Sequence, residues 1–475
     1  MASRLILQNK EKGLPLLFVF KGMNYLKIKK GVILRKRSCK FKQDIDVIAI
    51  LPNNDILALD KDVFAFLSHC NGFKSIKDLE FLYKKIFKSK IKLNESILKD
   101  YYLEKIIECV NKVDPINKNQ ILETKELTSA CRNVIWHLNQ KCNLNCQHCY
   151  YISQKSRKKE FTYNEIRKIV NNLCKLGIEK VTITGGEPTL NPNKLEFVAN
   201  LLKEKCIPFH INTNASNNVN IIAKVFSDNP YAKSVQVSID GLKSCHEKFR
   251  GKKHIFNKTL NNVKKMISQG INVKIISMIN KDWIGKEKEI FRLIDNLNVK
   301  QWLIEIPVKV GKWEKNYTEY DLNKEQLKKI FKNFINLIKR EKHNFEFFTI
   351  SQVYNWPECQ DFKNKKISDP ICYHHLGMLS FGPEGVSFCT PFSDKFGKSL
   401  YKIAPAYSDD IKKIWNKIVN VRLSHRLKDN KYCKKCNLFK YCQGGCPGRY
   451  EFSEKFSGCD EHSKLLAEIK KEIKI

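Results

Sequence analysis

Short apolar runs alternate with amphipathic stretches through the middle of the chain. An apolar run of about four to eight residues between helical patterns is typical of a buried strand in a parallel sheet. One helical stretch has a clear start, because Thr162 and Glu165 have the spacing of a capping box. Six runs have this length and are separated by helical stretches: 134–138, 180–184, 208–212, 234–239, 273–279 and 302–306.

Strand–helix units in series favour a parallel βα barrel or part of one. Residues 131–351 contain six such units, fewer than a closed barrel has. We therefore predict an α/β fold built on a partial (β/α)6 barrel. After residue 351 the alternation stops, so we expect residues 352–475 to form a separate domain that is rich in loops and cysteines.

The first 110 residues follow another pattern. Two short apolar runs flank the turn-rich tetrad Pro52-Asn53-Asn54-Asp55 and predict a hairpin. Residues 25–35 alternate in part like a strand, and three helical stretches follow the hairpin, at 61–70, 76–87 and 95–110. We predict a small winged-helix-like domain over residues 1–110. Residues 111–130 begin with a polar stretch that lacks periodicity, so we interpret them as a linker.

The charge balance is strongly basic, because 86 Lys and Arg outnumber 49 Asp and Glu and give a formal net charge of +37. Such an excess suits an acidic partner, either nucleic acid or an acidic peptide. The cations are scattered, which favours a solvated surface together with one basic segment at residues 27–42. The apolar run at 14–20 is too short to span a bilayer, and no cleavage site follows it. We therefore expect a cytoplasmic protein without membrane insertion.

Eighteen cysteines indicate metal binding rather than a disulfide scaffold, because disulfide-rich domains are usually much smaller and secreted. Cys142, Cys146 and Cys149 lie in one short stretch after the first predicted barrel strand, where barrel active sites lie. Three thiolates can hold three irons of a 4Fe-4S cube and leave the fourth iron open to a ligand. The alternative is a structural zinc ion, with His148 as the fourth ligand.

Polar or glycine-rich segments follow the next three predicted strands. Gly185-Gly186-Glu187-Pro188 follows the second strand, and its glycines allow the backbone to approach a ligand closely. Asn212-Thr213-Asn214 ends the third strand. Ser238-Ile239-Asp240-Gly241 ends the fourth, and Arg250-Gly251 follows downstream. Each segment taken alone is explained equally well as a turn or as a polar cap on a strand.

The cysteine spacings, the aromatic Tyr150 and the ordered strand-end segments resemble the radical S-adenosylmethionine (SAM) superfamily over residues 131–310. The resemblance implies a 4Fe-4S cluster on Cys142, Cys146 and Cys149. It implies reductive cleavage of SAM to a 5′-deoxyadenosyl radical, which takes a hydrogen atom from the substrate.

The resemblance also implies which residues hold SAM. Gly185, Gly186, Glu187 and Pro188 match the family segment that binds the amino group of the methionine. Ala215 stands where the family usually has glycine, which puts the shape of that turn in question. Polar groups at the other strand ends hold the ribose and the carboxylate in relatives, and here they are Asn212, Thr213, Ser238, Asp240 and Arg250.

Five cysteines with tight spacings close the chain, namely Cys433, Cys436, Cys442, Cys446 and Cys459. With Cys372 and Cys389 they resemble the SPASM extension of peptide-modifying radical SAM enzymes, although three residues separate Gly385 from Cys389 where the motif has four. The resemblance implies two auxiliary 4Fe-4S clusters, one on Cys433, Cys436, Cys442 and Cys459, the other on Cys372, Cys389 and Cys446. Cys359 is a candidate fourth ligand of the second cluster. Spacing alone leaves a zinc ribbon as the alternative.

The layout of residues 1–110 resembles the peptide recognition element of enzymes that mature ribosomal peptides, which binds a leader peptide as an added strand. The basic segment at 27–42 would suit an acidic leader. As a whole, the chain resembles radical SAM/SPASM peptide maturases, including the sactipeptide thioether synthases.

This resemblance implies a set of cofactors and partners. They are SAM, three 4Fe-4S clusters, a precursor peptide with a leader, and an external electron donor such as flavodoxin or ferredoxin. Thioether crosslinking of the peptide is the expected reaction. The alternatives are carbon–carbon crosslinking, epimerisation, modification of nucleic acid, and a non-catalytic iron–sulfur protein.

Overall fold

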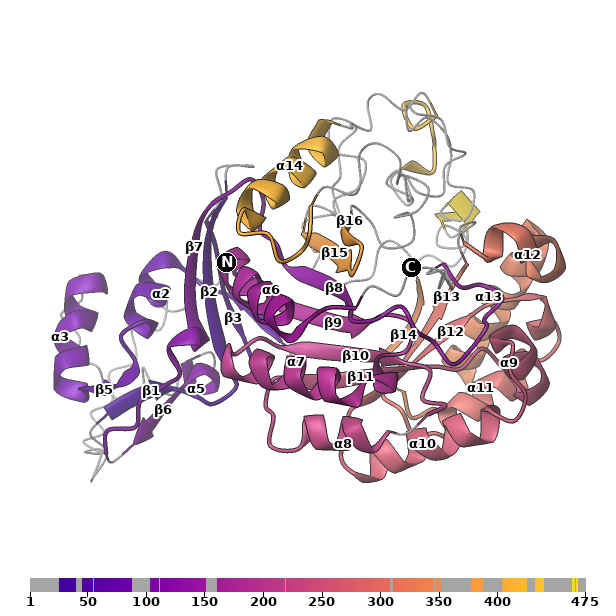
Figure 1. Cartoon of the computed structure of the whole chain (residues 1–475), viewed down its shortest axis with the longest axis horizontal. Helices are drawn as coiled ribbons and strands as arrows, with labels where there is room; N and C mark the ends of the chain where they lie inside the picture. The colour runs from indigo at the N-terminus through magenta and orange to yellow at the C-terminus, as the bar shows by residue number, and fades with distance from the viewer. Residues whose placement is uncertain are drawn as a thin grey trace.

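The structure of the protein is a computed structural model (Figure 1). It describes residues 25–39, 45–53, 55–87, 103–110, 112–150, 160–217, 219–307, 311–345, 347–351, 377–387, 404–424, 432–439, 464–465 and 467–468. Six cysteines that we predicted as cluster ligands lie outside the described residues: Cys359, Cys372, Cys389, Cys442, Cys446 and Cys459. In the described part of the chain, no helix is long and apolar enough to cross a membrane.

A nine-stranded sheet with strand order β14-β13-β12-β11-β10-β9-β8-β15-β16 forms the centre of the molecule. The six predicted barrel strands are present as β8 to β13, and β14 adds a seventh strand in parallel. The seven strands are β8 (Asn133–His137), β9 (Lys180–Thr184), β10 (Phe209–Thr213), β11 (Ala232–Ser238), β12 (Val273–Met278), β13 (Gln301–Glu305) and β14 (Phe347–Ser351).

Helices cover one face of this sheet (Figure 1). The strand side chains toward the helices are apolar and buried, such as Trp136, Ile183 and Val237, and they belong to one continuous core. The predicted capping box starts the first helix, since Glu165 N–H donates to Thr162 Oγ1 (3.2 Å). The helices are α6 (Tyr163–Leu176), α7 (Pro192–Glu204), α8 (Asn220–Phe226), α9 (Lys243–Arg250), α10 (Phe256–Ser268), α11 (Glu287–Asp295), α12 (Trp313–Tyr320) and α13 (Lys324–Arg340).

Part of the C-terminal region completes the central sheet. β15 (Met378–Gly382) pairs in parallel with β8, and β16 (Gly385–Ser387) forms an antiparallel hairpin with β15. α14 (Ile411–Ser424) packs near α6, and Trp415 Nε1 donates to Ser129 O (2.7 Å). The sheet therefore extends past residue 351, where we expected it to end, because residues 378–382 cover the open edge of β8.

The N-terminal region contains two sheets, with strand orders β5-β1-β6 and β4-β3-β2-β7. The predicted hairpin is present as β3–β4 and closes with a hydrogen bond from Leu51 N–H to Asp55 O (2.9 Å). Residues 25–35 hold β1 and the start of β2, separated by a turn in which Gly31 has φ 84°. The elements are β1 (Tyr25–Ile28), β2 (Ile33–Cys39), β3 (Ile45–Ile50), β4 (Ile56–Ala58), α2 (Lys61–Leu67), β5 (Asn71–Ser75), α3 (Ile76–Phe87), α5 (Leu103–Ile106) and β6 (Ile107–Val110).

Two expectations for this region are wrong. The stretch at 95–110 was expected to be a helix, but its described part holds only the short α5, followed by β6 paired with β1. The expected linker contains η2 (Lys118–Gln120) and β7 (Ile121–Leu127), which pairs in parallel with β2. Polar residues such as Glu123 and Lys125 on the outward face of β7 hid the strand from the sequence pattern.

Four cationic side chains of the basic segment at 27–42 are either buried or paired with carboxylates of the same chain. Arg35 and Arg37 are fully buried. Lys27 pairs with Asp114 and with Glu108, and Lys36 Nζ lies 3.1 Å from Glu123 Oε1. These four side chains are therefore engaged within the protein, and the expectation that the segment attracts an acidic leader rests on its other lysines.

Candidate active site

Cys142, Cys146 and Cys149 lie in the loop that follows β8, at the carboxyl end of the sheet. We call residues 139–150 the cysteine loop. Gly186 N–H donates to Asn139 O (2.9 Å), and Glu187 N–H donates to Lys141 O (2.8 Å), so the cysteine loop pairs with the loop after β9. A Cβ atom on Gly186 would lie 2.0 Å from Lys141 O. Glycine is therefore required at position 186 for the two loops to meet.

Two further segments hold the other side of the cysteine loop. Asn145 N–H donates to Arg250 O (3.2 Å), where α9 ends, and a Cβ atom on Gly251 would lie 2.4 Å from Asn145 O. Just before α12, Lys312 N–H donates to Cys149 O (3.0 Å). Backbone contacts from three separate elements thus fix the path of the loop that carries the three thiols.

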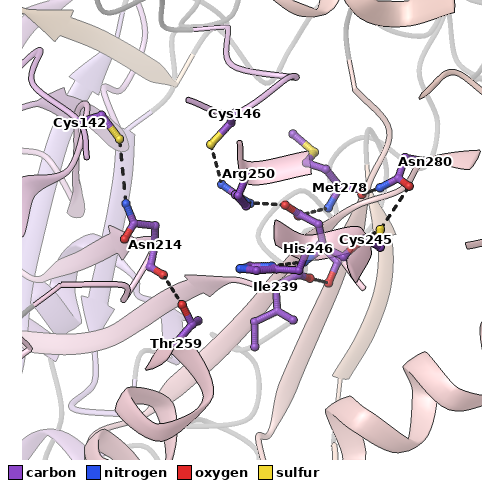
Figure 2. Close-up of polar contacts among 12 residues, drawn as sticks. Cys142, Cys146, Asn214, Ile239, Cys245, His246, Arg250, Thr259, Met278 and Asn280 are labelled. Atoms are coloured by element: carbon purple, nitrogen blue, oxygen red, sulfur yellow. Dashed lines mark hydrogen bonds and ion pairs between the residues drawn. The ribbon is translucent and has the colours of Figure 1, made fainter. Parts of the chain in front are cut away.

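A buried ion pair lies beside Cys146. Arg250 Nε donates to Asp240 Oδ2 (2.5 Å), and Arg250 Nη1 donates to Cys146 Sγ (3.7 Å), the contact that Figure 2 draws from the guanidinium to the sulfur. Burial opposes the charge of both groups. Their mutual attraction nevertheless keeps the pKa of Asp240 below its usual value and the pKa of Arg250 above it. The pair is therefore charged at neutral pH.

Glu187 is a buried carboxylate that joins the ends of β9 and β10. Its Oε1 accepts hydrogen bonds from Thr189 N–H (3.1 Å), Thr189 Oγ1 (2.7 Å) and Thr213 Oγ1 (2.7 Å), and its Oε2 accepts one from Asn214 N–H (2.8 Å). Burial raises the pKa of Glu187, while these hydrogen bonds lower it in part. Glu187 and Thr213, both predicted to contact SAM, thus bind each other in this structure.

The remaining predicted residues lie around the same edge. Pro188 is buried at the start of η3 (Pro188–Leu190). Asn212 and Ser238 are half-buried positions on the face of the sheet opposite to its apolar, helix-facing side. Asn214 Nδ2 donates to Asn143 Oδ1 (3.0 Å) and lies 4.0 Å from Cys142 Sγ. Figure 2 draws the contact between Asn214 and Cys142. The structure therefore brings all the predicted strand-end segments to the edge that carries the cysteine loop.

The chemistry of the cysteine loop fits an iron–sulfur cluster. Burial raises the pKa of the Cys142 thiol to about 11 and also raises that of Cys146, so both thiols hold a proton at neutral pH unless a metal replaces it. Three thiols on one loop are the donor set for three irons of a cube with a fourth iron open. Arg250 also supplies a cation beside them, which suits a group with negatively charged sulfurs.

His148 was the candidate fourth ligand of the alternative zinc site. Its ring stacks on Phe249 with centroids 4.4 Å apart, and burial lowers its pKa to about 3. Within the described ranges, no group of three or more His, Cys, Asp or Glu side chains is arranged to hold a single metal ion.

Of the predicted auxiliary ligands, Cys433 and Cys436 lie within the described residues. Cys436 N–H donates to Cys433 O (3.3 Å), so the two residues share one tight turn. Such a turn suits two thiolates of one cluster. The two auxiliary ligand sets stay predictions.

Sequence reasoning missed two residues of the site. Asn214 adjoins Thr213 in the third strand-end segment, so its place in that segment was a usable signal. His246 lies on α9, where its Nδ1 accepts a hydrogen bond from Asp240 N–H (3.2 Å). No signal separates this residue from an ordinary buried histidine, because its role depends on a contact between two elements.

Residues 136–294 match the sequence pattern of the Radical SAM superfamily. The chain is 28% identical over 194 residues to an Fe-coproporphyrin III synthase of Methanosarcina barkeri, covering 41% of this chain and 48% of that protein. It is 26% identical over 196 residues to the sporulation killing factor maturation protein SkfB of Bacillus subtilis, covering 41% and 47%. The chain thus spans about half the length of these curated relatives.

The fold is similar to that of Streptococcus suis SuiB, in a crystal structure bound to the precursor peptide SuiA. The TM-score is 0.67 at 16% identity, and the match covers 92% of this chain and 99% of SuiB. The fold likeness therefore includes the N-terminal region as well as the barrel. Taken with the three-cysteine loop, these matches identify residues 136–294 as a radical SAM domain.

Proposed function

We propose that this protein is a radical SAM enzyme that modifies a ribosomally made precursor peptide, with a thioether crosslink as the product. The observation that carries the proposal is the cysteine loop, whose three thiols follow β8 inside the radical SAM domain. The fold likeness to SuiB over nearly the whole chain supports a peptide as the substrate. We also propose that the protein is located in the cytoplasm and receives electrons from an external donor.

A 4Fe-4S cluster on Cys142, Cys146 and Cys149, with SAM on its open iron, would supply a carbon-centred radical that removes a hydrogen atom from the substrate. The chain's own residues hold and position these groups. Gly185 to Pro188, Asn212, Thr213, Ser238, Asp240 and Arg250 are the proposed SAM contacts. The backbone contacts around the cysteine loop fix the path of the loop that carries the three thiols.

Leader binding is proposed for the sheet β4-β3-β2-β7. β4 lies at the edge of that sheet, and its residues Ile56, Leu57 and Ala58 are half-buried or exposed. An extended peptide can add to such an edge by backbone hydrogen bonds, which need no charge complementarity. Because Arg35 and Arg37 are buried, we expect any salt dependence of leader binding to come from the lysines of the segment 27–42.

The thioether is proposed on chemical grounds. Joining a cysteine sulfur to a carbon removes two hydrogens and two electrons from the peptide. One electron leaves with the abstracted hydrogen atom, and the other needs an acceptor near the substrate. Auxiliary clusters on Cys433, Cys436, Cys442 and Cys459, and on Cys359, Cys372, Cys389 and Cys446, would provide one.

The first test needs no peptide. The full-length protein, reconstituted anaerobically with iron and sulfide, should form 5′-deoxyadenosine from SAM and a reductant. The variant with Cys142, Cys146 and Cys149 all replaced by alanine should form none, while iron bound by the C-terminal cysteines remains. Formation of 5′-deoxyadenosine by this variant would contradict the assignment.

The second test uses peptides encoded beside the gene. A mass loss of two hydrogens, with a cysteine that no longer alkylates, supports the thioether. The same mass loss with every cysteine still open to alkylation indicates a carbon–carbon crosslink. Incorporation of one solvent deuterium, with no loss of hydrogens, indicates epimerisation. The match to an Fe-coproporphyrin III synthase makes coproporphyrin a necessary control substrate. Its conversion, with no peptide product, would replace the peptide proposal.

A further inference from the structure

Arg250 contacts one of the three thiols through a guanidinium that is almost fully buried, with 8% of the residue exposed. Nε is bound to Asp240, and Nη1 lies 3.7 Å from Cys146 Sγ. Two nitrogens of the guanidinium therefore face a carboxylate and a thiol sulfur.

The carboxylate that holds Arg250 is itself fixed from several elements. Asp240 Oδ1 accepts a hydrogen bond from Met278 N–H on β12 (2.9 Å). Asp240 O accepts one from Trp283 Nε1 on η4 (Lys281–Trp283) at 2.8 Å. Groups on β12 and η4 therefore fix the carboxylate that holds the guanidinium beside Cys146.

Among the described residues, the other buried cations are Arg35, Arg37 and Lys233, which make their contacts elsewhere in the fold. Cys142 faces the neutral amide of Asn214, whose Nδ2 lies 4.0 Å from Cys142 Sγ. A hydrogen bond from a charged donor is about twice as strong as one from a neutral donor. Cys146 is thus electrostatically distinct from Cys142.

We propose that Arg250 is a positioning residue that raises the reduction potential of the cluster by donating a hydrogen bond to Cys146 Sγ. This inference rests on the proposed cluster at the cysteine loop, but it does not depend on the substrate. Reduction adds one negative charge to the cluster and its thiolates. A buried cation at hydrogen-bond distance from a ligand sulfur stabilises that charge, because little water screens the interaction.

The test is a redox titration of the reconstituted full-length protein without SAM, followed by electron paramagnetic resonance. The signal of this cluster is the one missing from the variant in which Cys142, Cys146 and Cys149 are alanine. In Arg250→Gln, we expect the ratio of reduced to oxidised cluster at a fixed potential to fall at least tenfold. For a one-electron couple this is about 59 mV toward more negative potential.

Two variants sharpen the result. Arg250→Lys keeps the charge but loses the planar fork, so its potential should lie between those of the wild type and Arg250→Gln. Lys252→Gln removes a cation from the same segment, but this exposed side chain contacts Asn143 O (3.3 Å) and no sulfur. We expect no more than a small shift in Lys252→Gln, and a shift equal to that of Arg250→Gln would reduce the effect to general charge removal and overturn the proposal.

The remaining outcomes are also decisive. An unchanged potential in Arg250→Gln, with weaker SAM binding, would make Arg250 a SAM contact only. If Arg250→Gln does not bind iron, Asp240→Asn takes its place. Removing this negative charge should move the potential the opposite way, and no such movement would overturn the inference. If the variant lacking the three cysteines keeps every signal, the proposed function fails instead.

Discussion

Two groups of buried arginines serve different ends in this protein. Arg35 donates to backbone carbonyl oxygens, among them Ile178 O (3.3 Å) and Cys206 O (3.2 Å), which lie just beyond α6 and α7. Arg250 donates to a carboxylate and to a thiol sulfur. Burial lowers the pKa of Arg35 to about 10, whereas Asp240 raises that of Arg250. A buried cation bound only by main-chain oxygens fixes a fold, and one aimed at a reactive atom can influence chemistry.

Arg37 strengthens the first group. Its Nη2 donates to Glu179 Oε1 (2.7 Å) at the start of β9, and Arg132 Nη1 lies 2.8 Å from the same oxygen. Glu179 is 1% exposed. The N-terminal sheet is therefore built onto the barrel through β2, and it is not an independent module joined by a linker.

Deletion of residues 1–110 should have the largest effect. It removes β2, leaves β7 without its partner and leaves Glu179 without Arg37. We expect no folded, soluble barrel, as measured by circular dichroism and size-exclusion chromatography. A folded fragment that cleaves SAM at the wild-type rate would show that the contact between the two regions is not needed.

Arg37→Ala is the graded form of that deletion. Removing one partner of a buried ion pair costs about 3–5 kcal/mol, and Arg132 should hold the cost to the lower end of that range. The measurement is calorimetric thermal unfolding of the full chain. Lys36→Ala is the matched control on the same strand, because its partly exposed pair with Glu123 contributes about 0–1 kcal/mol. Equal shifts in the two variants would contradict the comparison.

Gly186→Ala tests whether the candidate active site depends on the path of the cysteine loop. A Cβ at this position must displace Lys141 O, so the cysteine loop should move and the iron bound by its three cysteines should fall by more than half. Gly377→Ala is the control, since its φ is ordinary and its Cβ would meet only Arg132 side-chain atoms, none closer than 3.4 Å. Iron and labile sulfide assays on both variants decide the point. Full loading of Gly186→Ala would mean that the loop does not need this path.

The smallest effect concerns pH. Burial raises the pKa of Glu179, but the attraction of Arg37 and Arg132 lowers it by a larger amount. The pKa of Glu179 therefore lies below its usual value of 4.5. A group whose pKa is lower in the folded state stabilises the protein above its unfolded pKa, and this contribution fades as pH falls through the folded value. The difference in unfolding temperature between wild type and Glu179→Gln should therefore be constant from pH 8 to pH 6 and shrink below about pH 4.5. A difference that grows on acidification would reverse the sign of this argument.

The barrel strands and the site loops were predictable because each depends on local pattern. β8 to β13 are apolar runs, and Cys142, Cys146 and Cys149 lie within eight residues of one another. β7 was missed because polar residues such as Glu123 and Lys125 interrupt its apolar pattern, and β15 because its partner β8 is distant in sequence. The burial of Arg35 and Arg37 was missed for the same reason, since a cation that binds carbonyl oxygens of another element has the same sequence signature as a solvated one.

The pairing of β15 with β8 has a consequence for synthesis of the protein. β8 ends at residue 137, and its second neighbour begins at residue 378. At about 5–20 residues per second, a ribosome needs roughly 12–48 s to make the segment between them. During that interval the strand that leads into the cysteine loop has one open edge. During synthesis, the nascent chain therefore presents the three thiols beside an incomplete sheet. If iron is delivered after translation, the sheet beside the thiols is already complete.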